Sequence, residues 1–263
     1  MLRIIVCLKV VMDPETPVVT FGIAPGDMEA TWSEGVPPVL NPYDENCLEA
    51  ALRIKDLCPS RVTGVSLGSD LPKTVLKKAL AVGADDLVVL EDALFENLDG
   101  YGTAVVLAAA MKKIGDYDLI LTGRMGADTN AGQVGLGIAQ FLDIPSVSVA
   151  RAVRVNGSKA EVERVTGDGY EVVEVPMPCL VTVSHELGEL RSATVRGLTA
   201  ARKQPFTTWH ACDLGIELPL LRRSRLLRLF RPGRKVECQK LEGATAEAAA
   251  VNLALVLREL KLF

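Results

Sequence analysis

Aromatic residues and histidines are scarce in this chain of 263 residues. Only 5% of the residues are Phe, Trp or Tyr, and there are two histidines, whereas 49% are hydrophobic. A core must therefore be built mainly from Val, Leu, Ile and Ala, which favours an α/β fold over an aromatic-rich β-sandwich. His185 and His210 lie in no catalytic or metal-binding motif, so we interpret both as structural or surface residues rather than members of a Ser-His-Asp triad.

Paired cysteines and long apolar runs are also lacking. The six cysteines include no C-x-x-C pair, which argues against a zinc site and predicts buried thiols in a reducing cytoplasm. The longest purely apolar run, 104–111, is far shorter than the roughly 20 residues that span a bilayer. The chain opens directly on an apolar strand pattern without a secretory leader. We expect a cytoplasmic protein without a metal site or a membrane span.

The charge of the chain is small but unevenly distributed. A formal net charge of −4 predicts no overall attraction to nucleic acid or anionic lipid, yet residues 191–240 hold twelve basic and three acidic residues. The Arg-rich stretch 219–234 is compatible with a membrane-surface helix, a nucleic-acid patch, an arm bound to an acidic partner or a plain solvated face.

Buried-strand patterns alternate with helical patterns in the first half of the chain. This alternation predicts a doubly wound, mainly parallel sheet with right-handed crossovers. A Pro- and Gly-rich stretch, 13–42, is expected to be a long loop or a β-excursion, and loops of that length usually bind something. The predicted strands are 3–10, 62–67, 86–90 and 118–122, and the predicted helices are about 44–58, 71–80, 102–114 and 130–142.

The pattern changes after the fourth helix. Four strand patterns follow, at 146–155, 160–165, 170–175 and 179–184, with turn residues at 156–157 and 167–169. They predict an antiparallel or mixed extension of the sheet. A region of mixed polarity comes next, and the last helix is predicted at about 245–260.

A glycine-rich loop follows the fourth strand. The stretch 122–135, TGRMGADTNAGQVG, leads into a helix, where exposed backbone N–H groups can bind an anion. It is neither a Walker A loop nor a G-x-G-x-x-G fingerprint. A turn that eases close packing of helix and strand explains the glycines equally well.

A second candidate is Asn41-Pro42-Tyr43-Asp44, where the long loop returns to the sheet. Ligands of open α/β sheets bind outside the carboxyl ends of the strands, where Cys7, Leu67 and Gly123 are also expected. An ordinary helix start explains Asn41-Pro42 as well.

Four segments together resemble the beta subunit of an electron transfer flavoprotein. They are NPYDENCLEAALRIKD (41–56), KKALAVGADDLVVL (77–90), the glycine-rich loop and VERVTGDGYEVVEVPMPCLVT (162–182). The resemblance extends from residue 1 to about 205. It implies an adenine-nucleotide-binding, Rossmann-like domain at 1–189 and a partner-docking loop and C-terminal arm at 190–263, which wraps a flavoprotein alpha subunit.

The resemblance also implies a nucleotide site in this subunit, occupied by AMP in the housekeeping type and by a second FAD in the electron-bifurcating type. Asp99 and Thr103, before and in a helix, resemble the bifurcating type, in which NADH is the electron donor. The implied cofactor-binding residues are Cys7, Asn41, Pro42, Tyr43, Asp44, Leu67, Asp99, Thr103, Gly123, Arg124, Met125, Gly126, Ala127, Asp128, Thr129, Asn130, Ala131, Gly132, Gln133 and Val134. Asp128 is expected to order the loop rather than to contact an anion.

The resemblance implies an electron carrier without catalytic side chains, since the flavin supplies the redox chemistry. NADH oxidation is expected only for the bifurcating type. Val195 occupies the position of an apolar anchor for an acyl-CoA or other dehydrogenase, although an ordinary surface loop is the alternative. The rival hypothesis is a stand-alone ATP- or AMP-binding regulatory protein of related α/β fold.

Overall fold

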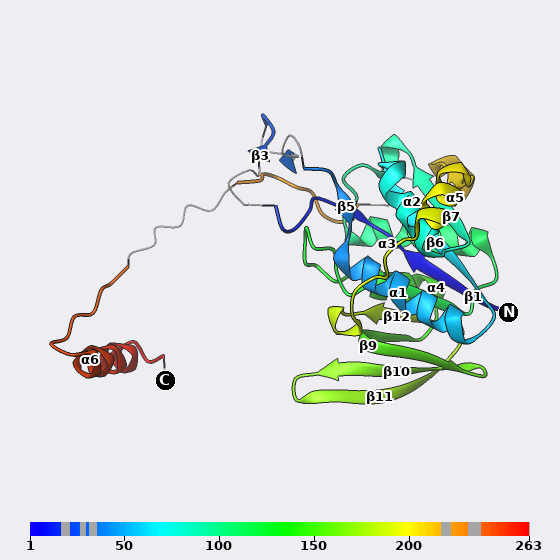
Figure 1. The fold of residues 1–263 in the computed structure, drawn as a ribbon. Helices are drawn as coiled ribbons and strands as arrows, with labels where there is room; N and C mark the ends of the chain where they lie inside the picture. Colours follow the sequence, from blue (N-terminus) through cyan, green and yellow to red (C-terminus); the bar gives the residue numbers. More distant parts are fainter. Residues whose placement is uncertain (17–21, 27–29, 32–35, 217–221, 231–237, 263) are drawn as a thin grey trace. The chain divides into compact units, whose positions relative to one another are not determined.

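A computed structural model describes residues 1–16, 22–26, 30–31, 36–216, 222–230 and 238–262. The chain divides into two compact units, Met1–Leu227 and Arg228–Phe263. Figure 1 shows the α/β fold of the first unit and the separate helix of the second. The boundary predicted at residue 190 separates a nucleotide-binding domain from a partner-docking region, and it stays a prediction. In the structure, the segment from 190 to 227 belongs to the first unit.

Nine strands of the described residues form one twisted sheet in the order β11-β10-β9-β12-β8-β1-β6-β7-β13. In this order, all neighbouring strands from β9 to β13 pair in parallel. Strand β10 pairs antiparallel with both β9 and β11. The predicted mainly parallel sheet with an antiparallel extension is confirmed. Its strands are β1 (Leu2–Cys7), β6 (Ser60–Gly68), β7 (Asp86–Glu91), β8 (Leu119–Gly123), β9 (Ser146–Asn156), β10 (Lys159–Thr166), β11 (Gly169–Pro176), β12 (Cys179–Val183) and β13 (Thr207–Trp209).

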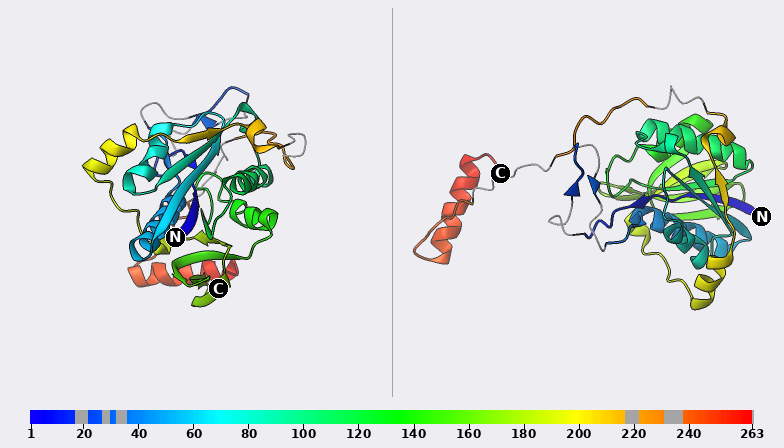
Figure 2. Two further views of the ribbon diagram at one scale, coloured as in Figure 1. Left: turned by 90° about the vertical axis from the view of Figure 1, so that its right-hand side faces the viewer. Right: turned by 90° about the horizontal axis from the view of Figure 1, so that it is seen from above.

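Helices cover both faces of the sheet (Figure 2). Alternate residues of β1 belong to different cores: Ile4 and Val6 pack with α1 and α2, whereas Ile5 packs with α3 and α4. This two-sided burial explains why the central strands are apolar throughout. The helices are α1 (Pro42–Leu57), α2 (Lys73–Val82), α3 (Gly100–Ile114), α4 (Val134–Leu142), α5 (Val195–Lys203) and α6 (Ala246–Glu259), with short 3₁₀ turns η2 (Ala93–Phe95), η3 (His185–Leu187) and η4 (Ala211–Leu214).

Two element boundaries predicted from the sequence are wrong. The first strand ends at Cys7 rather than residue 10, and Val10–Val11 form β2, which pairs antiparallel with β5 (Val39–Leu40). A further two-stranded sheet pairs β3 (Gly22–Ile23) with β4 (Ala30–Thr31). The fourth helix begins at Val134 rather than about 130, because Asn130 and Gly132 have positive φ values of 52° and 63°. Residues in the left-handed region interrupt a right-handed helix.

Strand β9 carries two irregularities. Between Val181 and Val183 of β12 the register against β9 shifts by one residue, at Val149, whose φ is 61°. The register against β10 shifts between Glu163 and Arg164. Each shift inserts one extra residue into β9, as in a β-bulge. The hydroxyl of Thr182 accepts a 2.9 Å hydrogen bond from the N–H of Val149.

The second unit contains α6. Thr245 caps this helix by accepting from the N–H of Ala248, and α6 has no buried residue in the described part of the chain. Val251, Leu253 and Leu255 are exposed on it. None of the described helices has the length and apolar character needed to cross a membrane.

Candidate functional site

A cavity of about 370 Å³ opens at the carboxyl ends of β1, β6 and β8. This is the edge of a parallel sheet at which ligands of open α/β folds bind. Most of the residues predicted for the cofactor site line it: Cys7, Asn41, Asp44, Leu67, Asp99, Thr103, Gly123, Arg124, Met125, Gly126, Thr129, Ala131, Gly132, Gln133 and Val134. Five stretches of the sequence, at residues 7, 41–44, 67, 99–103 and 123–134, thus meet around one cavity.

The glycine-rich loop forms one side of the cavity and ends at the first turn of α4. A turn closes where the carbonyl of Gly126 accepts from the N–H of Asn130 at 2.8 Å. A Cβ on Gly132 would lie 3.1 Å from the carbonyl oxygen of Arg124, in addition to the strain of the positive φ. The first N–H groups of α4 have no partner within the helix and can donate to an anion. The loop therefore brings a helix N-terminus to the cavity.

Asn41 holds this loop in place by hydrogen bonds to its backbone. Its buried side-chain amide donates to the carbonyl of Met125 at 2.9 Å, and its Oδ1 accepts from the N–H of Ala127 at 3.0 Å. Its own N–H donates to the carbonyl of Lys9 at 2.8 Å. Asn41 consequently fixes the loop to the chain that leaves β1, a role beyond a simple helix start.

Asp44 is a buried carboxyl behind the loop. Its Oδ2 accepts from the N–H of Lys9 at 2.7 Å, and its Oδ1 accepts from the N–H of Gly123 at 3.1 Å. Burial raises the pKa of Asp44 to about 7, although these hydrogen bonds, one from Asn41 and the Lys9 charge oppose the rise. Burial and the neighbouring Asp44 also raise the pKa of the Cys7 thiol. Near neutral pH, Asp44 can therefore lack the full negative charge that would repel an anion in the cavity.

Five predicted residues do not line the cavity: Pro42, Tyr43, Ala127, Asp128 and Asn130. Pro42 is the first residue of α1, where its missing N–H costs no helical hydrogen bond. The Tyr43 ring lies 6.5 Å from the ring of His185 and 5.9 Å from the Arg124 guanidinium. Asp128 forms an ion pair with Lys9, in keeping with the expectation that it orders the loop.

A further wall of the cavity includes Asp99, Gly100 and Thr103. Asp99 caps α3 by accepting from the N–H of Gly102 at 2.8 Å, and its second oxygen accepts from the N–H groups of Arg223 and Ser224. Burial acts to raise the pKa of Asp99, but these backbone donors outweigh it and hold the pKa below its ordinary value. Asp99 lines the cavity with a carboxylate already engaged by protein N–H groups.

The predicted cofactor-binding set omits several cavity residues, among them Lys9 and Thr122. Lys9 lies two residues after the end of β1, and that position at the carboxyl edge is the signal that could have identified it. Thr122, the first residue of the glycine-rich loop, has a buried hydroxyl without a hydrogen-bond partner among the described residues. A Cβ on Gly135 would overlap this hydroxyl, so Gly135 allows α4 to begin close to β8.

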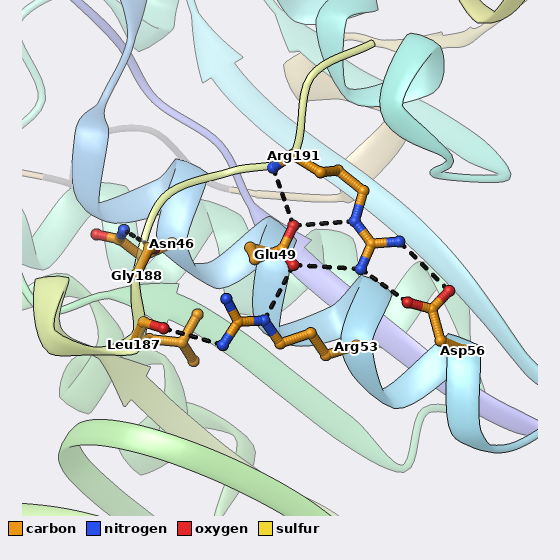
Figure 3. A network of polar contacts seen from close by, with 7 residues as sticks. All are labelled: Asn46, Glu49, Arg53, Asp56, Leu187, Gly188 and Arg191. Carbon is orange, nitrogen blue, oxygen red and sulfur yellow. Dashed lines mark hydrogen bonds and ion pairs between the residues drawn. The ribbon is translucent and has the colours of Figure 1, made fainter. Parts of the chain in front are cut away.

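The segment that leads to Val195 is anchored on α1 by a network around Glu49 (Figure 3). The buried Glu49 carboxylate accepts from Nε of Arg53 and from Nε and Nη2 of Arg191, at 3.0–3.2 Å. Arg191 also donates to Asp56 at 2.8 Å. Val195 opens α5 and is 82% exposed. The network fixes the base of a loop whose tip presents an apolar side chain to solvent.

Part of the Arg-rich stretch, 219–221 and 231–234, lies outside the described residues. In the described part, Arg222 donates to the carbonyl of Glu96 at 2.7 Å, and the Arg223 guanidinium lies 4.7 Å from the Tyr101 ring. This part of the stretch thus contacts the region of α3.

Comparisons with known proteins give consistent matches. Residues 33–214 match the electron transfer flavoprotein domain family. The chain is 39% identical to the caffeyl-CoA reductase-Etf complex subunit CarD of Acetobacterium woodii over 98% of both chains. It is 38% identical to the electron transfer flavoprotein subunit beta of Clostridium acetobutylicum, over 82% of this chain and 81% of the relative. It is 31% identical to the subunit of the same name from Bacillus subtilis, over 99% of both.

Proposed function

The chain belongs to the electron transfer flavoprotein family as a beta subunit, and from this premise we propose that it forms a heterodimer with a flavoprotein alpha subunit. The heterodimer would carry electrons between dehydrogenases and a redox acceptor. The name of the Acetobacterium woodii relative, a subunit of a reductase-Etf complex, supports assembly with other redox proteins. The described cysteines are free thiols, which is compatible with a reducing cytoplasm, but Cys212 and Cys238 are exposed and not buried as predicted.

The cavity at the carboxyl edge of the sheet carries the second part of the proposal, an adenine nucleotide bound to this subunit. Its volume of about 370 Å³ falls within the roughly 300–1,000 Å³ of small-molecule sites. The N-terminus of α4, Lys9 and Arg124 offer donors and positive charge for phosphate groups. We favour FAD as the nucleotide, with AMP as the rival occupant.

The residues around the cavity fit such a group. Gly126 and Gly132 allow the loop to fold tightly, since a Cβ on Gly126 would lie 2.6 Å from Oδ1 of Asp128 and one on Gly132 would lie 3.1 Å from the carbonyl oxygen of Arg124. The unpartnered hydroxyl of Thr122 offers a further polar group beside the cavity. Burial of Asp44 favours its neutral form, which lowers the repulsion of a phosphate.

The protein positions the nucleotide and supplies its electrostatic environment. A bound flavin supplies the electron-transfer chemistry, including acceptance of a hydride from NADH if the complex is bifurcating. Asn41 would keep the phosphate-binding loop in place, and the backbone N–H groups of the loop would bind the phosphates. Asp99, Gly100 and Thr103 would border the nucleotide from the side of α3.

The C-terminal region would bind the alpha subunit. Val251, Leu253 and Leu255 of α6 give this helix exposed apolar area, and the Arg-rich stretch adds positive charge. Apolar and charged groups in this combination suit a protein partner better than solvent. We interpret 219–234 as part of this partner-facing arm, apart from residues 222–224, whose hydrogen bonds are with Glu96 and Asp99 of this chain.

Cofactor content of the purified heterodimer tests the proposal. The chain is co-expressed with an electron transfer flavoprotein alpha subunit, and flavin and AMP are quantified per heterodimer. Two FAD support the bifurcating type, and one FAD with one AMP supports the housekeeping carrier. Failure to bind any flavoprotein partner contradicts the heterodimer, and absence of both AMP and a second FAD contradicts the nucleotide site.

Val195 gives a separate test of partner docking. We expect Val195→Ala to slow electron transfer to or from the partner dehydrogenase about tenfold, because removal of an apolar hot-spot side chain typically costs more than about 1 kcal/mol. Flavin content should stay unchanged. Leu57→Ala is the control, since Leu57 is equally exposed at the end of α1. Equal rates for the two variants would contradict a docking role.

A further inference from the structure

A short stretch of chain, residues 91–103, forms a thin wall of the cavity. It connects the end of β7 with the first turn of α3. Several of its residues, Phe95, Asn97, Leu98, Asp99, Gly100 and Thr103, line the cavity. A Cβ on Gly100 would lie 3.0 Å from Oε1 of Gln133, the residue that caps α4. The position of this wall therefore sets the distance between α3 and the glycine-rich loop.

The segment after α5 holds the beginning of this wall. Strand β13 pairs with β7 at the edge of the sheet, so Trp209 lies opposite Leu90. Nδ1 of His210 lies 2.5 Å from the carbonyl oxygen of Glu91, and the N–H of Ala211 donates to Oδ2 of Asp92 at 3.0 Å. Contacts to two successive wall residues thus come from one short segment.

Residues 222–224 hold the rest of the wall. Nη2 of Arg222 donates to the carbonyl of Glu96 at 2.7 Å. The N–H groups of Arg223 and Ser224 each donate to Oδ2 of Asp99 at 2.7 Å, and the Ser224 hydroxyl lies 3.1 Å from the same oxygen. Oδ1 of Asp99 accepts from Gly102 at the start of α3. The Asp99 carboxylate therefore joins the first turn of α3 to residues 222–224.

We propose that residues 222–224 brace the cavity wall through Asp99 and so position α3 for the bound nucleotide. This inference rests on the proposed function, because it assigns a role at the same cavity. Hydrogen bonds to a carboxylate are stronger than those between neutral groups, and three of them converge on one oxygen here. Arg223 and Ser224 act through Asp99 and are positioning residues. The retention of the nucleotide therefore depends on the position of residues 222–224.

Three variants of the full chain test the brace without altering a cavity residue. Ser224→Pro removes the N–H and the hydroxyl together, and Ser224→Ala keeps the N–H. Leu227→Pro is the control, since Leu227 is exposed and its proline lies past the contacts with Asp99. Dissociation rates of FAD and of AMP are measured for each variant, together with amide hydrogen exchange over 93–103 in the nucleotide-free chain.

We expect Ser224→Pro to release the bound nucleotide about tenfold faster, equivalent to about 1.4 kcal/mol, and to speed exchange in 93–103. Ser224→Ala should release it within about threefold of the wild type, and Leu227→Pro at the wild-type rate. Wild-type rates of release and exchange in Ser224→Pro overturn the brace, as does equal acceleration in Leu227→Pro. If the wild type binds neither FAD nor AMP, the nucleotide site itself is wrong, and unchanged exchange in 93–103 would then reject the brace independently.

Discussion

Nζ of Lys9 lies 2.6 Å from Oδ2 and 2.8 Å from Oδ1 of Asp128. This ion pair connects the chain after the first strand with the glycine-rich loop, more than a hundred residues further along the sequence. Both side chains are more than a third exposed, and such a pair contributes little stability by itself, about 0–1 kcal/mol. Its importance is positional, because Lys9 also lines the cavity.

Lys9→Met should weaken the binding of AMP or FAD about tenfold, since it removes one positive charge from the cavity while keeping the length of the side chain. Asp128→Asn keeps Lys9 and should change affinity by less than about threefold. Titration calorimetry of the two variants at constant ionic strength measures both effects. Equal losses in both variants would mean that Lys9 acts only by ordering the loop.

Gly132→Glu should reduce nucleotide binding at least about 100-fold while the chain stays folded, because a carboxylate would enter a site built for anions. Gly157→Glu is a matched control. Gly157 has a φ of 60°, close to the 63° of Gly132, but lies in the β9–β10 turn with open space around its Cβ position. Both variants should lose about 1 kcal/mol of stability from the positive φ, and Gly132→Glu should lose more, because its Cβ would also crowd the carbonyl oxygen of Arg124. Retention of nucleotide by Gly132→Glu would disprove the placement of the phosphate.

Asp44 should make the stability of the chain depend on pH in an unusual direction. Its pKa rises from 3.8 to about 7 through burial, so between about pH 4 and 7 the folded chain holds a proton that the unfolded chain has lost. The free energy of unfolding therefore falls as pH rises through this window and levels off above it, by at most about 4 kcal/mol from this group.

Asp44→Asn removes this contribution. Urea unfolding of the wild type and of Asp44→Asn across the pH range isolates the contribution of Asp44, because the other carboxyl groups are common to both. The difference between the two curves should change steadily from pH 4 to 7. A difference that is constant with pH would refute the buried, proton-binding state of Asp44.

Arg191→Met should destabilise the first unit by about 2 kcal/mol, since it removes the two hydrogen bonds that the Arg191 guanidinium donates to the buried carboxylate of Glu49. Arg164→Met is the matched control, because Arg164 pairs with Glu171 where both side chains are roughly half exposed. It should cost less than about 0.5 kcal/mol. Denaturant unfolding of the full chain measures both, and similar losses would show that the Glu49 network adds no more than a surface pair.

The sequence pattern was sufficient for the sheet and for the segments that meet at the cavity. Apolar runs buried on two faces identify β6, β7 and β8, and the carboxyl-edge rule places Cys7, Leu67 and Gly123 near one another. The pattern could not show that β1 ends at Cys7, because Leu8 and Val11 are also buried although the chain has left the strand.

Long-range hydrogen bonds explain the remaining differences. The hydrogen bonds from Arg223 and Ser224 to Asp99 join positions about 120 residues apart in the sequence, and no local motif predicts them. Strand β13 has three residues, too few for a periodicity to be recognised. The start of α4 depends on the left-handed residues Asn130 and Gly132, whose conformation the sequence alone left open.

The two irregularities of β9 have a joint consequence for how its sequence can vary. Val147, Ala150 and Val153 are three residues apart and all lie in the same core, a spacing that the two-residue period of a regular strand cannot produce. Each extra residue reverses which positions of the strand, odd-numbered or even-numbered, face the core. The second reversal therefore restores the alternation that the strand had before the first. The effects of the two bulges on side-chain orientation therefore cancel. Deletion of the extra residue of one bulge alone would reverse which of the following side chains of β9 face the core. Deletion of both extra residues would leave the orientation at the two ends of the strand unchanged.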